Sequence, residues 1–303
     1  MTRVFERKFS KLKVVLKAMR VHQWLKNTLI FVPVFVSSLY LEPAVWGNAL
    51  IGFLLFSLLA SATYLLNDLL DIDADRTHPR KYLRPIPSGM LTIKQAILLA
   101  GGLLVASIIG ATLFTDTAFQ LALLAYLALT LLYTFMLKSY VIADVISLAS
   151  LFTIRIIAGA MVIDVVLSFW LLAFSMFTFF SLALVKRCAE LKLLSKVNKD
   201  KATGRDYQVD DYQLMQSFGV TSAFISLLLV AFYVQVSMNN EEYSTPLLLW
   251  ASLPAFAYWF LRMWLKTNRG EMHDDPIVFS IKNKGSLATI CFILIITLLA
   301  KLI

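Results

Sequence analysis

Long apolar runs alternate with short polar segments along almost the whole chain. A helix that crosses a bilayer needs about 20 predominantly apolar residues, and nine runs approach or exceed that length. They are residues 25–41, 44–66, 92–114, 118–136, 141–163, 167–185, 215–237, 246–264 and 286–303. The pattern therefore predicts an all-α integral membrane protein, in which residues 1–303 form a single membrane domain with a nine-helix bundle over residues 25–303.

The composition agrees with a membrane location. Of the 303 residues, 59% are hydrophobic and 16% are charged, and the mean hydropathy is +0.75. A soluble domain could not hide so much apolar surface. The net charge of +9 is therefore not a sign of nucleic-acid binding, and no nucleic-acid partner is expected. The sequence leaves the oligomeric state open, a homo-oligomer included.

Charge is divided unequally between the two sides of the predicted bundle. If the chain begins inside, the 28 lysines and arginines fall on the inner side, with two exceptions, Arg155 and Lys301. The outer connections carry only acids, which are Glu42, Asp116, Asp164, Glu241 and Glu242. The positive-inside rule then predicts an inner-membrane protein with a cytoplasmic N-terminus, a cytoplasmic mouth rich in polar residues, and an external C-terminus.

The first 24 residues have an amphipathic pattern of their own. Apolar residues recur at Phe5, Phe9, Leu12, Leu16 and Met19, and basic residues surround them. This spacing predicts a helix that lies on the inner leaflet of the bilayer. A surface anchor without a chemical role is the favoured interpretation.

Acidic residues follow directly on the second apolar run. At about 100° per residue, Asp68, Asp71 and Asp75 share one face of a continuous helix, together with Asn67, whereas Asp73 points elsewhere. Three carboxylates on one face repel one another unless a cation lies between them. Oxygen ligands favour Mg²⁺, which usually bridges to substrate phosphates. An acidic helix cap at the membrane surface is the alternative, but capping needs only one acid.

Two charged residues lie within the fifth predicted span. Asp144 and Arg155 are eleven residues apart, so they share a helix face about 16 Å apart along the axis. An arginine at that depth normally faces the bundle interior, where it is paired or lines a polar cavity. Either a structural ion pair or a substrate contact explains these residues.

Further candidates lie at the inner ends of the predicted spans. Lys138 is the one cation of its loop and could bind phosphate, but a lysine that extends to the interface is equally plausible. Lys186 and Glu190 have the spacing of a helix-surface pair. We favour a site role here, because Lys186 and Arg187 would face the acidic cluster if the two halves of the chain are related. Lys81 and Arg84 suit an anion that arrives as a metal complex.

These motifs resemble a known family. Asn67-Asp68-x-x-Asp71-x-x-x-Asp75, followed by Arg84-Pro85-Ile86-x-x-Gly89, is similar to the first signature of the UbiA superfamily of membrane prenyltransferases. The resemblance covers nearly the whole chain. Typical members carry a second Asp-rich motif after span 6, and the two motifs together bind two Mg²⁺ ions and a prenyl diphosphate. Here that position reads Lys186-Arg187-Cys188-Ala189-Glu190.

The variant pattern resembles one branch of the superfamily, the decaprenyl-phosphate phosphoribosyltransferases. Its marks are Gln23-Trp24-Leu25-Lys26-Asn27, Tyr133-Thr134-x-x-Leu137-Lys138, Asp144 with Arg155, Lys186-Arg187-x-x-Glu190, and Asp274-Asp275-Pro276. The resemblance implies transfer of phosphoribosyl from 5-phosphoribosyl 1-diphosphate to a polyprenyl phosphate. Replacing the second acidic motif by cations makes room for an anionic acceptor, since two carboxylate sites would repel a lipid phosphate.

We therefore expect a membrane-embedded transferase with Mg²⁺ as its cofactor, and with Asp68, Asp71 and Asp75 as catalytic metal ligands. The expected substrate-binding residues are Asn67, Lys26, Lys81, Arg84, Tyr133, Lys138, Asp144, Arg155, Lys186, Arg187 and Glu190. Two alternatives remain at this point. One is a UbiA-type enzyme that moves a prenyl group to an aromatic acceptor. The other is a transporter or lipid-binding protein with an acidic cation site. The gathering of the polar residues at one mouth argues against a transporter, because no charged path crosses the bilayer.

Overall fold

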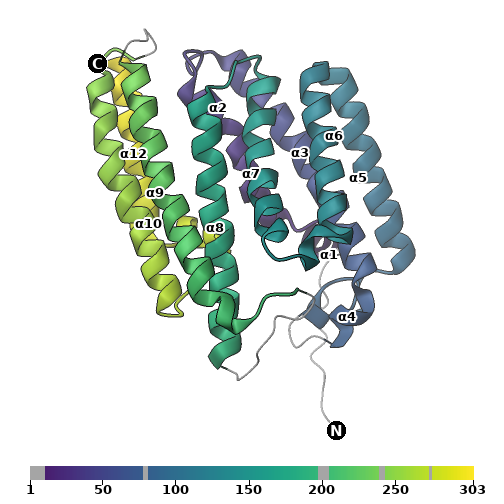
Figure 1. The fold of residues 1–303 in the computed structure, drawn as a ribbon. Coiled ribbons are helices and arrows are strands. Elements are labelled where there is room, and N and C mark those ends of the chain that lie inside the picture. The colour runs from purple at the N-terminus through teal and green to yellow at the C-terminus, as the bar shows by residue number, and fades with distance from the viewer. Residues whose placement is uncertain (1–10, 78–80, 197–204, 239–242, 273–274) are drawn as a thin grey trace.

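The computed structural model describes residues 11–77, 81–196, 205–238, 243–272 and 275–303. Helices are the elements of all these segments (Figure 1), so the all-α prediction is confirmed. In the N-terminal amphipathic segment, α1 (Lys11–Ala18) is helical, and a turn at residues 19 and 20 ends it. The predicted apolar positions Phe5 and Phe9 lie outside the described residues.

Seven helices of the described residues are long and apolar enough to cross a membrane. These helices are α3 (Pro43–Leu70), α5 (Ile93–Phe114), α6 (Thr117–Phe135), α7 (Ala143–Val162), α8 (Phe169–Lys196), α9 (Tyr212–Ser237) with the 3₁₀ turn η4 (Val209–Asp211) before it, and α12 (Lys284–Leu302). They agree with seven of the nine predicted spans.

The other two predicted spans are shorter and irregular, so the count of nine is not confirmed. The first becomes a 3₁₀ helix, η1 (Val21–Phe31), joined to the short α2 (Val32–Val36). The eighth becomes a 3₁₀ helix, η5 (Pro246–Ala251), followed by α10 (Ser252–Asn268), which also carries Arg262 and Lys266. Pro33 and Pro246 lie in the first turn of α2 and of η5. Proline lacks a backbone N–H, which is tolerated in a first turn but interrupts a long regular α-helix.

The helices form two groups with α7 and α8 between them (Figure 1). On one side α3 packs along α5 and contacts α6; on the other α9, α10 and α12 pack together. The remaining short elements are α4 (Ile72–Thr77), η2 (Lys81–Leu83), η3 (Leu137–Ser139) and α11 (Pro276–Lys282). We call the end of the bundle that carries α4, and at which α3 ends and α7 begins, the polar end.

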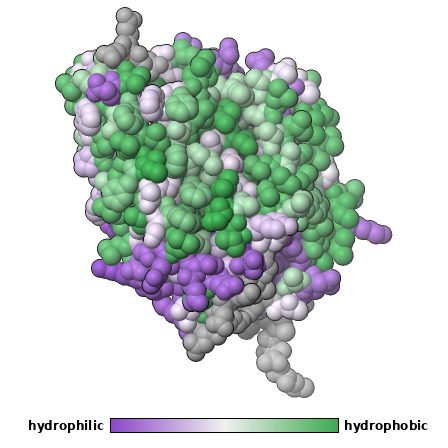
Figure 2. Space-filling model, viewed as in Figure 1, coloured by the Kyte–Doolittle hydropathy of each residue, from purple (hydrophilic) through white to green (hydrophobic). Residues whose placement is uncertain are grey.

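Surface chemistry separates the polar end from the rest of the molecule. Figure 2 shows hydrophobic side chains over the sides of the bundle and a belt of hydrophilic residues at the polar end. The C-terminus lies at the opposite end (Figure 1). Exposed leucines, isoleucines and phenylalanines on helices such as α5 would be costly in water. The distribution is that of a multi-pass membrane protein.

The 3₁₀ helix η1 lies against α7 at unusually short range. A Cβ added to Gly159 of α7 would lie 2.2 Å from the backbone oxygen of Ile30. No residue except glycine therefore fits this crossing without displacement of the backbone. The close approach brings Asn27 of η1 within hydrogen-bond distance of Arg155, one helical turn before Gly159.

Candidate functional site

The acidic segment does not form one continuous helix. Helix α3 ends at Leu70, Asp71 has φ −92° and ψ 11°, and α4 begins at Ile72. The prediction of one continuous helix is therefore wrong at Asp71, although the backbone N–H of Asp75 still donates to the oxygen of Asp71 at 2.8 Å. Asp68 and Asp75 do face a common point, as predicted. The three carboxylates are split between a buried pair and a more exposed third residue.

Asp68 and Asp75 form the buried pair, and Arg84 joins them. The Nη1 atom of Arg84 donates to Asp68 Oδ1 at 3.0 Å and also contacts Asp75 Oδ2. Arg20 contacts the same Asp68 oxygen, and Lys81 Nζ lies 3.6 Å from Asp75. A guanidinium therefore occupies the place between the carboxylates where the sequence requires a cation.

Asp71 faces a different set of partners. The Asn67 amide donates to Asp71 Oδ2 at 3.1 Å, and Lys138 Nζ lies 3.7 Å from Asp71 Oδ1. The Asp71 side chain is 34% exposed. Asp73 is 91% exposed, in agreement with the prediction that it points away. We call the three acids other than Asp73, together with their basic partners, the open cluster. Its members are Asp68, Asp71, Asp75, Arg20, Lys81, Arg84 and Lys138.

A second group of charges lies between α7 and α8, and we call it the closed cluster. Arg187 donates through Nη2 to Asp144 Oδ1 at 3.0 Å and through Nη1 to Glu190 at 2.7 Å. Its Nε also contacts Asp144, and Tyr133 donates to Asp144 at 2.9 Å. The Arg187 side chain is 2% exposed and Asp144 is fully buried. Each guanidinium nitrogen of Arg187 already has an acidic partner.

The backbone before Asp144 is held in a rare conformation. Ile142 has φ 69° and ψ −50°, and the N–H of Ala143 donates to the oxygen of Val141 at 2.8 Å, which closes a γ-turn. A positive φ is unfavourable for a β-branched residue. The N–H of Ile142 donates to the hydroxyl of Tyr207, and burial together with the charge of Asp144 raises the pKa of that phenol.

A cavity of about 350 Å³ lies between η1, α3, α6, α7 and α8. Five of its lining residues are charged, which are Arg20, Lys26, Arg155, Lys186 and Asp275. Asn67 and Tyr133 also line it, and Leu148, Leu151 and Phe152 supply an apolar wall. With four cations and one carboxylate, the cavity is suited to an anionic ligand.

Arg155 and Asp144 do not pair with each other. The Nε of Arg155 donates to Asn27 Oδ1 at 2.9 Å, and Nη2 donates to the hydroxyl of Tyr126 at 3.2 Å. Lys26 Nζ lies 2.8 Å and Lys186 Nζ 3.5 Å from the same oxygen of Asp275. Asp275 also caps α11, where its Oδ1 accepts from the N–H of Ile277.

The structure thus divides the expected site residues into three places. The open cluster, with Asn67 beside it, holds Asp68, Asp71, Asp75, Lys81, Arg84 and Lys138. The cavity holds Lys26, Tyr133, Arg155 and Lys186. The closed cluster holds Asp144, Arg187 and Glu190. We expected Lys186 and Arg187 both to face the acidic cluster. Instead, Arg187 is bonded to Asp144 of α7, and Lys186 lies beside Asp275. Neighbours on one helix diverge by about 100°.

Sequence reasoning missed several residues of the site. Arg20 was counted only as part of the basic N-terminal segment, and Tyr126 was not singled out. The sequence holds a signal for both residues. Tyr126 is a polar residue within an apolar run, and Arg20 lies three residues before the Gln23–Asn27 motif. Asp275 was noted only as part of a motif. Its position before Pro276 is typical of a helix N-cap.

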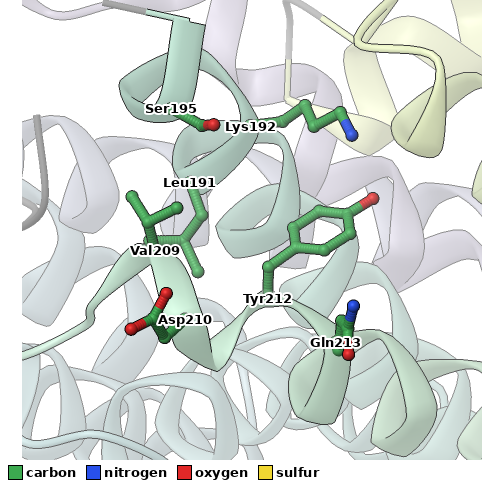
Figure 3. Close-up of a pocket in the computed structure, with 7 residues that line it drawn as sticks. All are labelled: Leu191, Lys192, Ser195, Val209, Asp210, Tyr212 and Gln213. Carbon is green, nitrogen blue, oxygen red and sulfur yellow. The ribbon is translucent and has the colours of Figure 1, made fainter. Parts of the chain in front are cut away.

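A further cavity, of about 340 Å³, lies at the polar ends of α8 and α9 (Figure 3). Lys192 and Asp210 are among its lining residues, and the Lys192 ammonium lies 5.1 Å from the centre of the Tyr212 ring. None of the expected site residues lines it.

The described residues hold no preformed metal site. Among them, no group of three or more acidic, histidine or cysteine side chains converges in a way that could hold a metal ion, because the carboxylates of the open cluster face cations. The donor set still fits Mg²⁺, since Asp68 and Asp75 direct one oxygen each to a single point that Arg84 now occupies.

Comparison with known proteins gives the family. The UbiA prenyltransferase family matches residues 30–295. The chain is 38% identical to an uncharacterized protein, y4nM, of Sinorhizobium fredii over 89% of its own length, and spans about half (52%) of that relative. It is 31% identical to the nodulation protein NoeC of Azorhizobium caulinodans, over 90% of this chain and 89% of the relative.

Similar proteins with a named activity include decaprenyl-phosphate phosphoribosyltransferases. The decaprenyl-phosphate phosphoribosyltransferase of Mycolicibacterium smegmatis is 37% identical over 60% of this chain and 58% of its own. Among solved structures, a UbiA homolog from Archaeoglobus fulgidus bound to GPP and Mg²⁺ matches with a TM-score of 0.70. That match covers 96% of this chain and all of the other, but at 16% identity it concerns the fold alone.

Proposed function

Because the chain belongs to the UbiA prenyltransferase family, we propose that it transfers 5-phosphoribosyl from phosphoribosyl diphosphate to a polyprenyl phosphate and releases diphosphate. The observation that carries this proposal is the contrast between the two ion clusters. The open cluster offers carboxylates to a diphosphate–metal complex, whereas the closed cluster has its acids bound to Arg187. A donor that needs two acidic motifs has only one here.

The open cluster is the proposed donor site. Asp68, Asp71 and Asp75 would hold Mg²⁺, with Asn67 orienting Asp71. When bound, Mg²⁺ would neutralise charge that develops on the leaving diphosphate. Lys81 and Arg84 lie beside these acids, and their released ammonium and guanidinium groups would bind the phosphates of the donor. Lys138, which lies beside Asp71, would hold a phosphate at the rim.

The cavity is the proposed place of the transfer step. A phosphate oxygen of the lipid forms a bond to the anomeric carbon of the ribosyl group, and the bond from that carbon to the diphosphate breaks. The phosphate is already anionic, so no strong general base is needed. The cations that line the cavity would hold the two anionic substrates close together, and Leu148, Leu151 and Phe152 would exclude water from the reacting carbon.

The proposal includes an orientation in the membrane. Basic residues outside the spans collect on the predicted inner side, so the polar end would face the cytoplasm and the C-terminus the exterior of an inner membrane. Residues 1–303 would form one membrane domain, with the cation-rich α1 on the inner leaflet. The phosphoribosyl donor is water-soluble and would reach the polar end directly.

The test is a donor swap with purified protein. We expect Mg²⁺-dependent transfer of label from phosphoribosyl diphosphate into the lipid fraction when decaprenyl phosphate is present. Omission of either substrate, or addition of EDTA, should abolish the labelled lipid and the release of diphosphate. Label that passes instead from a prenyl diphosphate to 4-hydroxybenzoate would reject the proposal in favour of an aromatic prenyltransferase. No product from either donor would leave the transporter or lipid-binding alternative.

A further inference from the structure

Arg155 is a buried cation without an acidic partner among the described residues. Its polar contacts are the side-chain oxygens of Asn27 and Tyr126 and the backbone oxygen of Leu151. Three aromatic rings surround the guanidinium, at 4.9 Å (Tyr126), 5.2 Å (Phe152) and 5.7 Å (Phe56) from their centres. Only 4% of the residue is exposed, although it lines the cavity.

An isolated charge at this depth is costly unless something compensates it. Neutral oxygens and ring faces compensate only in part. A guanidinium has five N–H donors, and the contacts within the described residues use three of them. The remaining N–H groups and the net charge are therefore left for a ligand. An anion in the cavity is the group that would satisfy both.

The orientation of Arg155 is fixed before any ligand arrives. Asn27 is buried, and its amide nitrogen donates to Ser57 at 2.9 Å, so its oxygen is directed to Arg155. The contact between Gly159 and η1 holds Asn27 in place. Preorganisation of this kind is typical of a binding site and lowers the entropy lost on binding.

Two more cations on the same cavity already share an anion. Lys26 and Lys186 both lie within ion-pair distance of one oxygen of Asp275. Burial by itself would raise the pKa of Asp275, but the two ammonium groups outweigh burial and lower the pKa to about 2. The carboxylate is therefore ionised at neutral pH, and it occupies the position where a ligand anion would meet both lysines.

The surroundings of these cations distinguish between possible anions. Leu148 and Phe152 border the main cavity and also a small cavity of about 30 Å³ between α7, α8 and α11. Leu182, Ala183 and Ile277 line that small cavity beside Lys26 and Lys186. Apolar side chains therefore lie directly next to the two lysines. A lipid phosphate would place the first carbons of its chain against these side chains, whereas a ribose phosphate has no apolar group to place there.

We propose that Arg155, Lys26 and Lys186 form a subsite for a phosphate monoester, and that its ligand is the phosphate of the lipid substrate. Asp275 is the resident counter-ion, which the incoming phosphate displaces. A phosphate dianion carries more charge and more acceptor oxygens than a carboxylate, so it competes favourably for the same lysines. The assignment to the acceptor lipid rests on the proposed function; the anion subsite itself does not.

Binding of farnesyl phosphate to the detergent-purified full-length protein tests the subsite, without donor or Mg²⁺. We expect Arg155→Met and Lys186→Met each to weaken binding roughly 10- to 100-fold, as for a lost charge-assisted hydrogen bond. Lys94→Met, which removes an exposed charge at the start of α5, should bind as the wild type does. Unchanged affinity in both cavity variants would overturn the proposal.

Two competitors identify the source of the phosphate. Farnesol should not displace farnesyl phosphate, and ribose 5-phosphate should do so only at far higher concentration. If ribose 5-phosphate binds as tightly, and Arg155→Met weakens it equally, the subsite belongs to the donor and the lipid assignment is wrong. Arg155→Lys, which keeps the charge, and thermal unfolding of each variant separate weaker binding from a folding defect.

Asp275→Asn tests the counter-ion. Since this change removes the competing charge and keeps the shape, farnesyl phosphate should bind several-fold more tightly; weaker binding would contradict displacement. The two proposals fail separately. A wild type that binds farnesyl phosphate through Arg155 and Lys186 but transfers no phosphoribosyl rejects the proposed function alone. Transfer that persists with unchanged lipid affinity in both variants rejects the subsite alone.

Discussion

Arg84 and Arg187 each join two carboxylates near the polar end, in different surroundings. Arg84 is 27% exposed and shares its acids with Arg20 and Lys81. Arg187 is 2% exposed and is bonded to Asp144 and Glu190. Water can hydrate Arg84 if it leaves its partners, whereas a displaced Arg187 would leave Asp144 buried and unpaired. The open cluster can therefore exchange its cation, and the closed cluster connects α7 to α8.

The largest expected effect is on the acids of the open cluster. Asp68→Asn, Asp71→Asn or Asp75→Asn should lower the transfer rate on the order of 10²–10³-fold, because each removes a proposed metal ligand. Asp73→Asn, which alters an exposed acid of the same segment, is the matched control and should keep its activity. Initial rates at saturating Mg²⁺ measure the effect. Equal losses in all four variants would contradict the assignment of Asp68, Asp71 and Asp75, but not Asp73, as metal ligands.

In the closed cluster we expect a loss of stability instead. Arg187→Met should lower the free energy of unfolding by about 3–5 kcal/mol, since it leaves Asp144 without its partner. The double variant with Asp144→Asn should recover part of this loss. Thermal unfolding in detergent checks both. A normal unfolding temperature with a large rise in KM would instead make Arg187 a substrate contact.

Lys186 provides a contrast with its direct neighbour. Lys186→Met should raise the KM for polyprenyl phosphate roughly 10-fold, because the cavity loses one of its cations, with little change in the unfolding temperature. The KM for phosphoribosyl diphosphate should stay near the wild-type value. Steady-state kinetics with each substrate varied in turn gives the answer. If Lys186→Met and Arg187→Met have the same effects on KM and on the unfolding temperature, the division between cavity and closed cluster is wrong.

A smaller effect is expected for Arg84 of the open cluster. Arg84 occupies the point between Asp68 and Asp75, so Arg84→Gln should increase the affinity for a divalent cation several-fold in the absence of donor. The same change should raise the KM for the donor, whose phosphates lose a partner. Titration with Mn²⁺, followed by electron paramagnetic resonance, measures the first effect. Weaker Mn²⁺ binding would show that Arg84 does not compete with the metal.

The smallest expected effect concerns pH. The pKa of Asp275 is lowered from 3.8 to about 2, so the stability contributed by its ion pairs is complete above about pH 4 and is lost only as the pH falls towards 2. Between pH 5 and 8 the residue does not titrate. The acidic limbs of the pH–rate profiles of wild type and Asp275→Asn should therefore have the same shape down to pH 5, whatever the absolute rates. A shifted acidic limb in the variant would contradict this assignment.

The sequence was informative about where charge lies and less so about its partners. Apolar run lengths predicted the helical membrane fold, and the Asp68–Asp75 segment and its basic neighbours indeed lie together. The break at Asp71 was not predictable from periodicity. A run of period 3.6 contains no information on a local kink.

Pairing over long distances was the other limit. Asp144 and Arg155 share a helix face, but their partners, Arg187 and Asn27, come from α8 and η1. Spacing along one helix says which side chains point the same way. Which neighbouring element supplies the partner depends on packing, and here on a backbone contact at Gly159 that a single sequence does not reveal.

That contact between Gly159 and Ile30 also bears on how the protein would move. Backbones that touch cannot slide past each other without a clash, so η1 and α7 should shift together as one rigid unit. The proposed lipid substrate would nevertheless have to enter a cavity of about 350 Å³. Asp275, at the start of α11, contacts Lys26 and Lys186 through ion pairs, which exchange partners more readily than a backbone contact can yield. We therefore expect the cavity to widen where Asp275 meets the two lysines, while the contact between η1 and α7 stays closed.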